Sequence, residues 1–154
     1  MAIARSSPLF GCLVFWIAGV GAFWAASDQD ALKPNNAFVI RAAEWVGCAQ
    51  TYVFPVHPPG AARAVPGFAR IGESQRDCFE RQPEGRAFPE FNALVYSLDT
   101  LLPLVDFEIQ DHWLPDEDKP YGLAARIYLW LHIGVGWLLS LLAVAGFSGL
   151  VKSD

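Results

Sequence analysis

Two apolar blocks without charged residues lie near the two ends of the chain, and they constrain its fold more than any other feature. The first runs from Leu9 to Ala26 (LFGCLVFWIAGVGAFWAA), and the second from about Ile127 to Val151 (IYLWLHIGVGWLLSLLAVAGFSGLV). A helix rises 1.5 Å per residue, so about 20 residues cover the roughly 30 Å hydrocarbon core of a bilayer. Each block therefore predicts a transmembrane helix.

The composition agrees with this prediction and excludes one class of partner. The 154 residues are 53% hydrophobic, and most of the apolar excess lies in the two blocks. The net charge is −5, and Lys and Arg form no cluster. Nucleic acids are bound mainly through cationic side chains, so we predict no nucleic-acid partner.

The first block differs from a cleavable signal peptide. Cleavage after Ala25 or Ala26 would require a small residue two positions earlier, where Phe23 or Trp24 stands. We therefore expect an uncleaved membrane anchor.

The flanking charges predict the orientation. Arg5 precedes the first block and Lys152 follows the second, whereas residues 27–122 carry eight Lys and Arg against fifteen Asp and Glu. Positive residues favour the cytoplasmic side, so we expect both termini there and the long segment outside. Aromatic and basic side chains at the start of the second block predict an interfacial collar: Arg126, Tyr128 and Trp130.

Proline and glycine interrupt residues 28–86 repeatedly, which predicts turns and short helices with little sheet. Within this stretch Ala37–Cys48 has apolar residues at helical spacing, and Asn35 or Asn36 offers an N-cap. We expect a short surface helix there.

Two of the three cysteines, Cys48 and Cys78, fall in the outer segment, and Cys12 lies inside the first block. An oxidising compartment favours a disulfide between the outer pair, with two free thiols as the alternative. Closing this loop would stabilise the folded segment by about 3–4 kcal/mol in the chain-entropy model. No further ligand lies at metal-binding spacing, so we predict no metal site.

Residues 88–110 form an apolar stretch that is too short and too charged for a third span. Asp99 and Asp106 are seven residues apart, which predicts one polar helix face, and Pro103 would kink or end the helix. The predicted apolar face consists of Leu94, Leu98, Leu101, Leu102 and Val105. We expect a helix that lies in the outer interface or dips into it. The two carboxylates are candidates for a cation or proton site, although a cap and a solvated face are the favoured interpretation.

Three stretches resemble a group of poorly characterised bacterial membrane proteins: KPNNAFVIRAAEW (residues 33–45), FNALVYSLDTLLPLVDFEIQDHWLPD (91–116) and LHIGVGWLLSLLAVAGFSGLVK (131–152). Some members carry pentapeptide repeats or are labelled membrane-associated oxidoreductases, and the similar pieces form their C-terminal membrane module. The resemblance covers nearly the whole chain and implies a bacterial inner-membrane protein with a periplasmic loop. This chain departs from the oxidoreductase label, because it has no Gly-rich dinucleotide loop, Cys-x-x-Cys or haem attachment motif.

An intramembrane histidine and stripes of small residues are the remaining candidates for a site. His132 lies inside the second block, where an imidazole can bind haem or a chlorophyll-type pigment or simply bond a neighbouring helix. The second interpretation is favoured, so no cofactor is predicted. Small residues at helical spacing predict close helix packing on both spans: Ala18, Ala22 and Ala26, and Gly136, Ser140 and Ala143.

Taken together, these features predict a mainly α membrane protein with two transmembrane helices, an interfacial helix and a Pro-rich, disulfide-linked extracytoplasmic region. The expected divisions are residues 1–26, 27–90, 91–122 and 123–154. No nucleophile and base motif stands out, so we predict no enzyme.

The leading functional hypothesis is a non-catalytic accessory or scaffold subunit that packs with other membrane subunits, as in a respiratory or photosynthetic complex, or with copies of itself. The alternative is a degenerate two-span pore-loop ion channel or a homo-oligomeric membrane protein. The stretch Leu-Pro-Leu-Val-Asp lacks the glycines that a carbonyl-lined filter needs.

Overall fold

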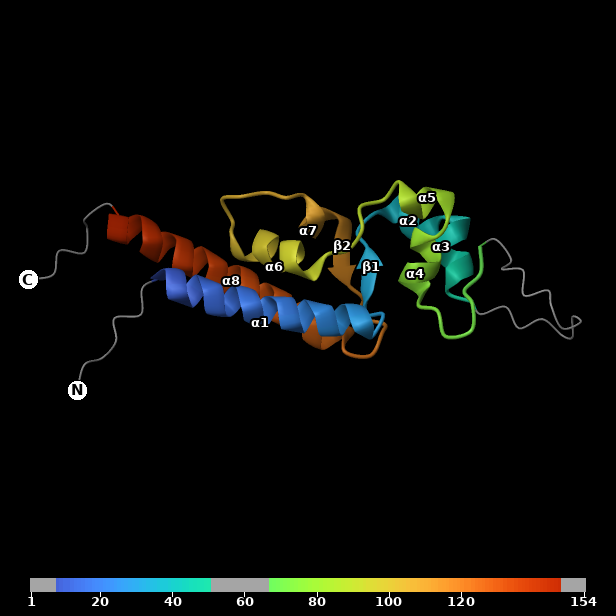
Figure 1. Cartoon of the computed structure of the whole chain (residues 1–154), viewed down its shortest axis with the longest axis horizontal. Coiled ribbons are helices and arrows are strands. Elements are labelled where there is room, and N and C mark those ends of the chain that lie inside the picture. The colour runs from blue at the N-terminus through green and yellow to red at the C-terminus, as the bar shows by residue number, and fades with distance from the viewer. Residues whose placement is uncertain (1–7, 51–66, 148–154) are drawn as a thin grey trace, which may run out of the picture.

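A computed structural model of the chain describes residues 8–50 and 67–147. Two long helices, α1 (Pro8–Asp28) and α8 (Gly122–Phe147), pack side by side and form a helical hairpin (Figure 1). The start of α1 and the end of α8 lie at the same end of the hairpin (Figure 1). Both helices are long and apolar enough to cross a membrane.

The helix boundaries differ a little from the expected spans. The first helix extends from Pro8 to Asp28 rather than from Leu9 to Ala26, and α8 begins at Gly122, five residues before Ile127. A turn supports this earlier start, because the Gly122 N–H donates to the Lys119 carbonyl at 3.0 Å. The last residues of the expected second span, 148–151, lie outside the described residues.

A group of four short helices forms what we call the disulfide domain, at the far end of the hairpin (Figure 1). These helices are α2 (Ala37–Arg41), α3 (Ala43–Cys48), α4 (Gln75–Glu80) and α5 (Pro83–Arg86). Their shared core contains Trp45, Cys48, Ala69, Cys78 and Phe79. The Cα atoms of Cys48 and Cys78 are 5.6 Å apart and the two residues form a disulfide, as expected, whereas Cys12 of α1 is free.

The single surface helix expected over Ala37–Cys48 is wrong in one respect, because the structure has two helices there. Ala42 adopts an extended backbone (φ −63°, ψ 143°) that separates α2 from α3. Asn36 is the N-cap of α2, and its side-chain oxygen accepts from the Phe38 N–H at 2.9 Å. Both helices lie at the surface, and α3 buries one face, with Trp45 and Cys48, in the core of the disulfide domain.

Two three-residue strands lie between the hairpin and the disulfide domain. Strand β1 (Leu32–Pro34) pairs antiparallel with β2 (Trp113–Pro115), with Lys33 opposite Leu114. Beside them the Lys33 ammonium lies 2.8 Å from Asp116. This small ribbon ties residues that are about 80 positions apart and fixes where the disulfide domain leaves the hairpin.

The helix α6 (Ala93–Leu101) packs along the hairpin and contacts both α1 and α8 (Figure 1). Asn92 caps its start by accepting from the Leu94 N–H at 3.0 Å. It ends two residues before Pro103, as the sequence predicts. A loop of residues 102–108, which we call the return loop, leads to α7 (Ile109–His112).

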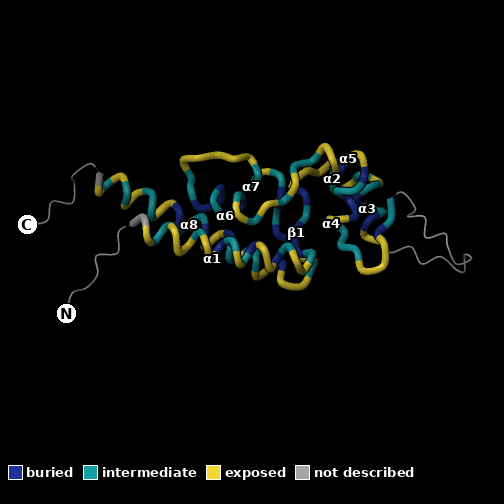
Figure 2. The backbone as a smooth tube through the Cα atoms, viewed as in Figure 1, coloured by how far each residue is buried: buried dark blue, intermediate teal, exposed yellow. Residues whose placement is uncertain are grey.

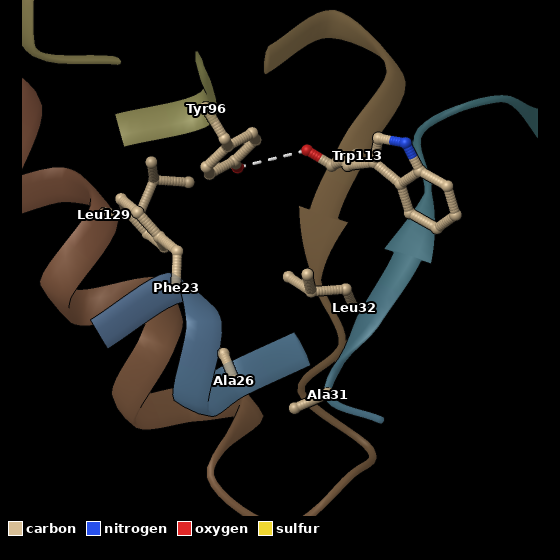
Figure 3. Packing of buried hydrophobic residues seen from close by; sticks show 7 residues of the cluster. All are labelled: Phe23, Ala26, Ala31, Leu32, Tyr96, Trp113 and Leu129. Carbon is tan, nitrogen blue, oxygen red and sulfur yellow. Dashed lines mark hydrogen bonds between the residues drawn. The ribbon is translucent and has the colours of Figure 1, made fainter. Parts of the chain in front are cut away.

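The core of the molecule lies where α6, the ribbon and the hairpin meet. It consists of Phe23, Ala26, Ala31, Leu32, Tyr96, Trp113 and Leu129. Figure 3 shows Tyr96 between the long helices and β2, where its hydroxyl donates to the Trp113 carbonyl at 3.1 Å. Burial is concentrated in this central region and in the disulfide domain, and the hairpin is mostly exposed (Figure 2).

The polar and apolar faces expected for the 88–110 helix are wrong. The buried residues of α6 are mostly polar or amphipathic: Tyr96, Ser97, Asp99, Thr100 and Leu101. Of the expected apolar face, Leu94 is exposed, as a lipid-facing side chain would be, but Leu101 is buried, and Leu102 and Val105 lie beyond the helix end. The helix therefore buries a largely polar side, from which Ser97 bonds the backbone of α1 and Tyr96 bonds that of β2.

Candidate functional site

The candidate site is a polar junction where α6 lies across the middle of the hairpin. The Ser97 hydroxyl of α6 donates to the Trp16 carbonyl of α1 at 2.9 Å. In return, the Trp16 indole N–H donates to the Leu94 carbonyl at 3.0 Å. These two reciprocal bonds fix α6 against α1, far from either end of that helix.

His132 of α8 completes the junction from the other side. Its side chain is only 2% exposed, and its Nε2 atom lies 3.1 Å from the Ser97 carbonyl and 3.3 Å from the Ser97 hydroxyl. Because a carbonyl can only accept, this contact requires a proton on Nε2. In the neutral imidazole Nδ1 is then the acceptor nitrogen, and it has no partner among the described residues.

The ring of His132 packs between two aromatic side chains. Its ring lies edge to face with Phe23, with the centroids 5.6 Å apart, and stacks on Tyr128 at 5.4 Å. Because Nε2 donates to Ser97, a haem or a chlorophyll-type pigment could bind this nitrogen only by displacing α6, and the unpartnered Nδ1 is buried. The arrangement fits the favoured interpretation, a histidine that bonds a neighbouring helix.

Two glycines allow α6 to approach the hairpin so closely. A Cβ atom at Gly19 would overlap the Ser97 hydroxyl and the His132 ring, and one at Gly136 would overlap the Leu101 carbonyl. Both positions need a hydrogen in place of a side chain. Gly136 was predicted as a packing residue, whereas Gly19 was not.

Asp99 holds the return loop against the end of α6. It is 1% exposed, and its two carboxylate oxygens accept from the Phe107 N–H at 2.8 Å and the Gln110 N–H at 2.9 Å. Asp106, by contrast, is exposed in the return loop and accepts from the Glu108 N–H at 2.8 Å. The expected shared face of Asp99 and Asp106 is wrong, because the helix ends between them.

The small-residue stripes are only partly on the packing faces. On α1, Ala26 is buried, Ala22 is half-buried and Ala18 is exposed. On α8, Gly136 is buried and Ser140 and Ala143 are half-buried. The buried stripe of α1 instead contains Gly19, Phe23 and Ala26.

An open groove of about 450 Å³ lies between α1 and α8 near the ribbon. Five alanines and three polar side chains line it. The alanines are Ala22, Ala25, Ala26, Ala124 and Ala125, and the polar side chains are Gln29, Tyr121 and Tyr128. Within residues 8–50 and 67–147, no three or more His, Cys, Asp or Glu side chains are grouped to hold a metal ion.

Three residues that together position α6 were not predicted from the sequence as site residues: Ser97, Trp16 and Gly19. One signal was present, because Tyr96, Ser97 and Thr100 recur at helical spacing inside an apolar stretch. Such a polar stripe indicates a helix face that meets other backbone rather than lipid. Gly19 and Trp16 carry no comparable signal in a block that is apolar on all sides.

Comparisons with known proteins identify no relative of this chain. No protein-family model, curated protein or solved structure matches this chain. The resemblance to the bacterial membrane module therefore stays a prediction from the sequence.

Proposed function

We propose that this chain is a non-catalytic accessory or scaffold subunit of a larger membrane assembly, with α1 and α8 crossing the bilayer and the disulfide domain outside the cytoplasm. The proposal includes the bacterial inner membrane as its location and the cytoplasm as the side of both termini. It rests on one observation above all, the large apolar surface that the hairpin leaves uncovered.

That surface is a property of both long helices. Most of their large apolar side chains are exposed: Phe10, Leu13, Val14, Phe15, Ile17 and Trp24 on α1, and Leu123, Ile127, Trp130, Leu131, Trp137, Leu138, Leu141, Leu142 and Val144 on α8. In water such a surface would drive aggregation, whereas in a bilayer lipid tails or neighbouring helices cover it. The exposed Trp24 and Trp130 lie toward the ribbon end of the two helices, where an aromatic belt is expected.

The arrangement favours a structural role for the polar groups in the hairpin. Ser97, His132 and Asp99 each bond to backbone or to one another, and in doing so they hold α6 and the return loop in place. The chain thus presents a rigid hairpin, an inserted short helix and a disulfide-stabilised outer domain to its surroundings. Such a body is suited to packing against other subunits.

Gentle detergent extraction from native membranes, followed by native mass spectrometry and an absorbance spectrum, tests this proposal. We expect the chain to co-purify at fixed stoichiometry with other membrane subunits, for example those of a respiratory or photosynthetic complex. A lone monomer with nothing bound at any detergent concentration would refute it.

A pore-loop channel is the second candidate, favoured by the place of α6. A short helix that lies between two spans and is followed by a loop is the order used by two-span channel subunits. Reconstituted protein with a cation flux that Asp106→Asn changes would support the channel, and the absence of flux would exclude it. Asp99→Asn is less informative, because Asp99 holds the return loop.

A further inference from the structure

We propose that the return loop, residues 102–108, is the docking surface for a transmembrane segment of another protein that carries a Lys or Arg side chain. The proposal rests on the proposed function, because it requires α1 and α8 to span the bilayer. It names the surface through which the subunit would bind its partner.

The return loop begins at a depth where the hairpin would be surrounded by hydrocarbon. The Leu101 carbonyl approaches Gly136, which lies six residues along α8 from the exposed Trp130, or about 9 Å at 1.5 Å per residue. In Figure 1 the loop leaves the end of α6, rises away from the hairpin and runs back over α6 to α7. Loop and helix therefore form a re-entrant element rather than one that lies on the surface.

Lipid tails are a poor cover for this loop. The N–H groups of Leu104 and Asp106 donate no hydrogen bond to the described part of the chain. Non-helical backbone at membrane depth is tolerated only where protein covers it or water reaches it, because an unpaired N–H costs several kcal/mol, on the order of 2–7, in an apolar medium.

Water alone is an equally poor cover. Leu104 is 76% exposed, and the side chains of Val105 and Phe107 beside it are also exposed. A surface that mixes apolar side chains with unpaired N–H groups and a carboxylate matches a protein partner, which can supply apolar contacts and hydrogen bonds at once.

The carboxylate of Asp106 indicates the charge of that partner. One of its oxygens accepts from the Glu108 N–H, and no cation within the described residues pairs with it. Charged side chains within membranes are nearly always paired, so a Lys or Arg from the partner would neutralise it.

A second copy of the chain cannot supply this cation from its described residues. All eight described Lys and Arg residues lie between α1 and the first turns of α8: Lys33, Arg41, Arg70, Arg76, Arg81, Arg86, Lys119 and Arg126. None lies on the part of α1 or α8 that is level with the return loop. As far as the described residues go, the charge therefore favours a different chain over a second copy.

Photocrosslinking in native membranes tests the proposal. The full chain would carry p-benzoylphenylalanine at Leu104, with Leu141 as a matched site, because Leu141 is 63% exposed on α8. Each crosslinker would be combined with either Asp106 or Asp106→Asn. Asparagine keeps the oxygen that accepts from Glu108 but removes the charge.

We expect Leu104 to crosslink to a transmembrane peptide of another protein that contains Lys or Arg, as identified by mass spectrometry. The Asp106→Asn change should lower the yield at least fivefold at Leu104 and leave the yield at Leu141 unchanged. A crosslink at Leu104 to a second copy of this chain, or an equal yield with Asp106→Asn, would overturn the proposal.

Two further outcomes separate the failure of this proposal from failure of the proposed function. Protein adducts at Leu141 combined with lipid adducts alone at Leu104 would disprove the docking surface and leave the accessory role standing. Lipid adducts alone at both sites, with a lone monomer in native mass spectrometry, would contradict both.

Discussion

Three small residues set the distance between α6 and the hairpin: Gly19, Ser97 and Gly136. Ser97 reaches the Trp16 carbonyl only because Gly19, one turn further along α1, leaves room for its hydroxyl. The reciprocal bond from Trp16 to Leu94 depends on the same approach. Adding one methyl group at this point should therefore disturb the packing and the hydrogen bonds of the whole junction.

Gly19→Ala should destabilise the protein, although alanine is normally the better helix former. The new Cβ would overlap Ser97 and His132, and we expect a loss of about 1–3 kcal/mol, as for other overpacked positions. Unfolding in mixed micelles with increasing SDS measures the loss. Gly21→Ala is the control, because nothing lies within 4 Å of a Cβ there, and it should be neutral or slightly stabilising.

Asp99→Asn should loosen the return loop. The amide has one acceptor oxygen where the carboxylate has two, so either the Phe107 or the Gln110 N–H loses its partner, at a cost of about 1–3 kcal/mol. Amide hydrogen exchange at residues 107–110 should become faster. The same measurement on Asp106→Asn should show little change, and equal protection in all three proteins would contradict the role assigned to Asp99.

At the scale of the elements, the disulfide domain depends on a covalent link and on one well-formed ion pair. Cys48 of α3 and Cys78 of α4 hold together two helices that are otherwise joined through a segment of 26 residues, from Ala49 to Ser74. Its core of five buried residues is small, so the link matters more than it would in a large domain.

Replacing both cysteines with serine should open the disulfide domain. We expect a loss of about 3–4 kcal/mol, from the entropy of the unfolded loop, and faster tryptic cleavage after Arg70, Arg76 and Arg81. Cys12→Ser removes the free thiol of α1 and should leave the cleavage rate unchanged. Equal rates with and without the disulfide would show that the small core suffices.

The ion pair between Glu73 and Arg81 should make the disulfide domain sensitive to acid. Both guanidinium contacts are short, at 3.0 and 2.9 Å, and the hydrogen bond from Arg81 lowers the pKa of Glu73 below its usual value of 4.5. A lowered pKa means that the stabilisation is complete above pH 4.5 and is lost as the pH falls through the pKa of the folded state.

Arg81→Met should therefore cost about 1 kcal/mol at pH 7 and less at a pH low enough to protonate Glu73 in both proteins, below its lowered pKa. Amide hydrogen exchange in α4, corrected for the intrinsic rate at each pH, measures the difference. Arg86→Met is the matched control, because Arg86 is exposed and makes none of the observed ion pairs. A loss that is the same at both pH values would contradict the assignment.

The elements that local sequence determines are those that the sequence predicts well. The two long apolar helices, the Asn36 cap and the end of α6 before Pro103 all follow from residues within one or two turns. The faces of α6 do not, because its burial is decided by Trp16 and His132, which are 81 and 35 residues away from Ser97. The bonds from the Ser97 and Tyr96 hydroxyls to distant backbone bury a polar side of α6 that the apolar pattern did not predict.

The same distinction applies to the candidate site. His132 was recognisable as an unusual residue within a span, but its role depends on the partner that α6 brings to Nε2. Asp99 and Asp106 looked equivalent at a spacing of seven, and they separate only because the helix ends at Leu101. Sequence spacing predicts a shared face only where the helix continues across it.

At the scale of the whole molecule, the proposed function requires a bilayer around the hairpin. The disulfide domain and the ribbon lie at one end, the free ends of α1 and α8 at the other, and the exposed apolar surface lies between them (Figures 1 and 2). This division into a polar end and an apolar shaft is what a membrane-spanning hairpin requires. The groove at the ribbon end and the return loop are two places where this apolar surface is not continuous.

Thiol accessibility in intact cells and in membrane vesicles tests this division most directly. In a Cys12→Ser background, with the native disulfide intact, one cysteine would replace Ile71, which is 84% exposed near α4, and another would replace Leu141 on α8. We predict that a membrane-impermeant maleimide labels Ile71→Cys in intact cells after permeabilisation of the outer membrane alone. Leu141→Cys should resist labelling from either side of the membrane and react only after detergent is added. Rapid labelling of Leu141→Cys from water in intact membranes would contradict the claim that α8 spans the bilayer.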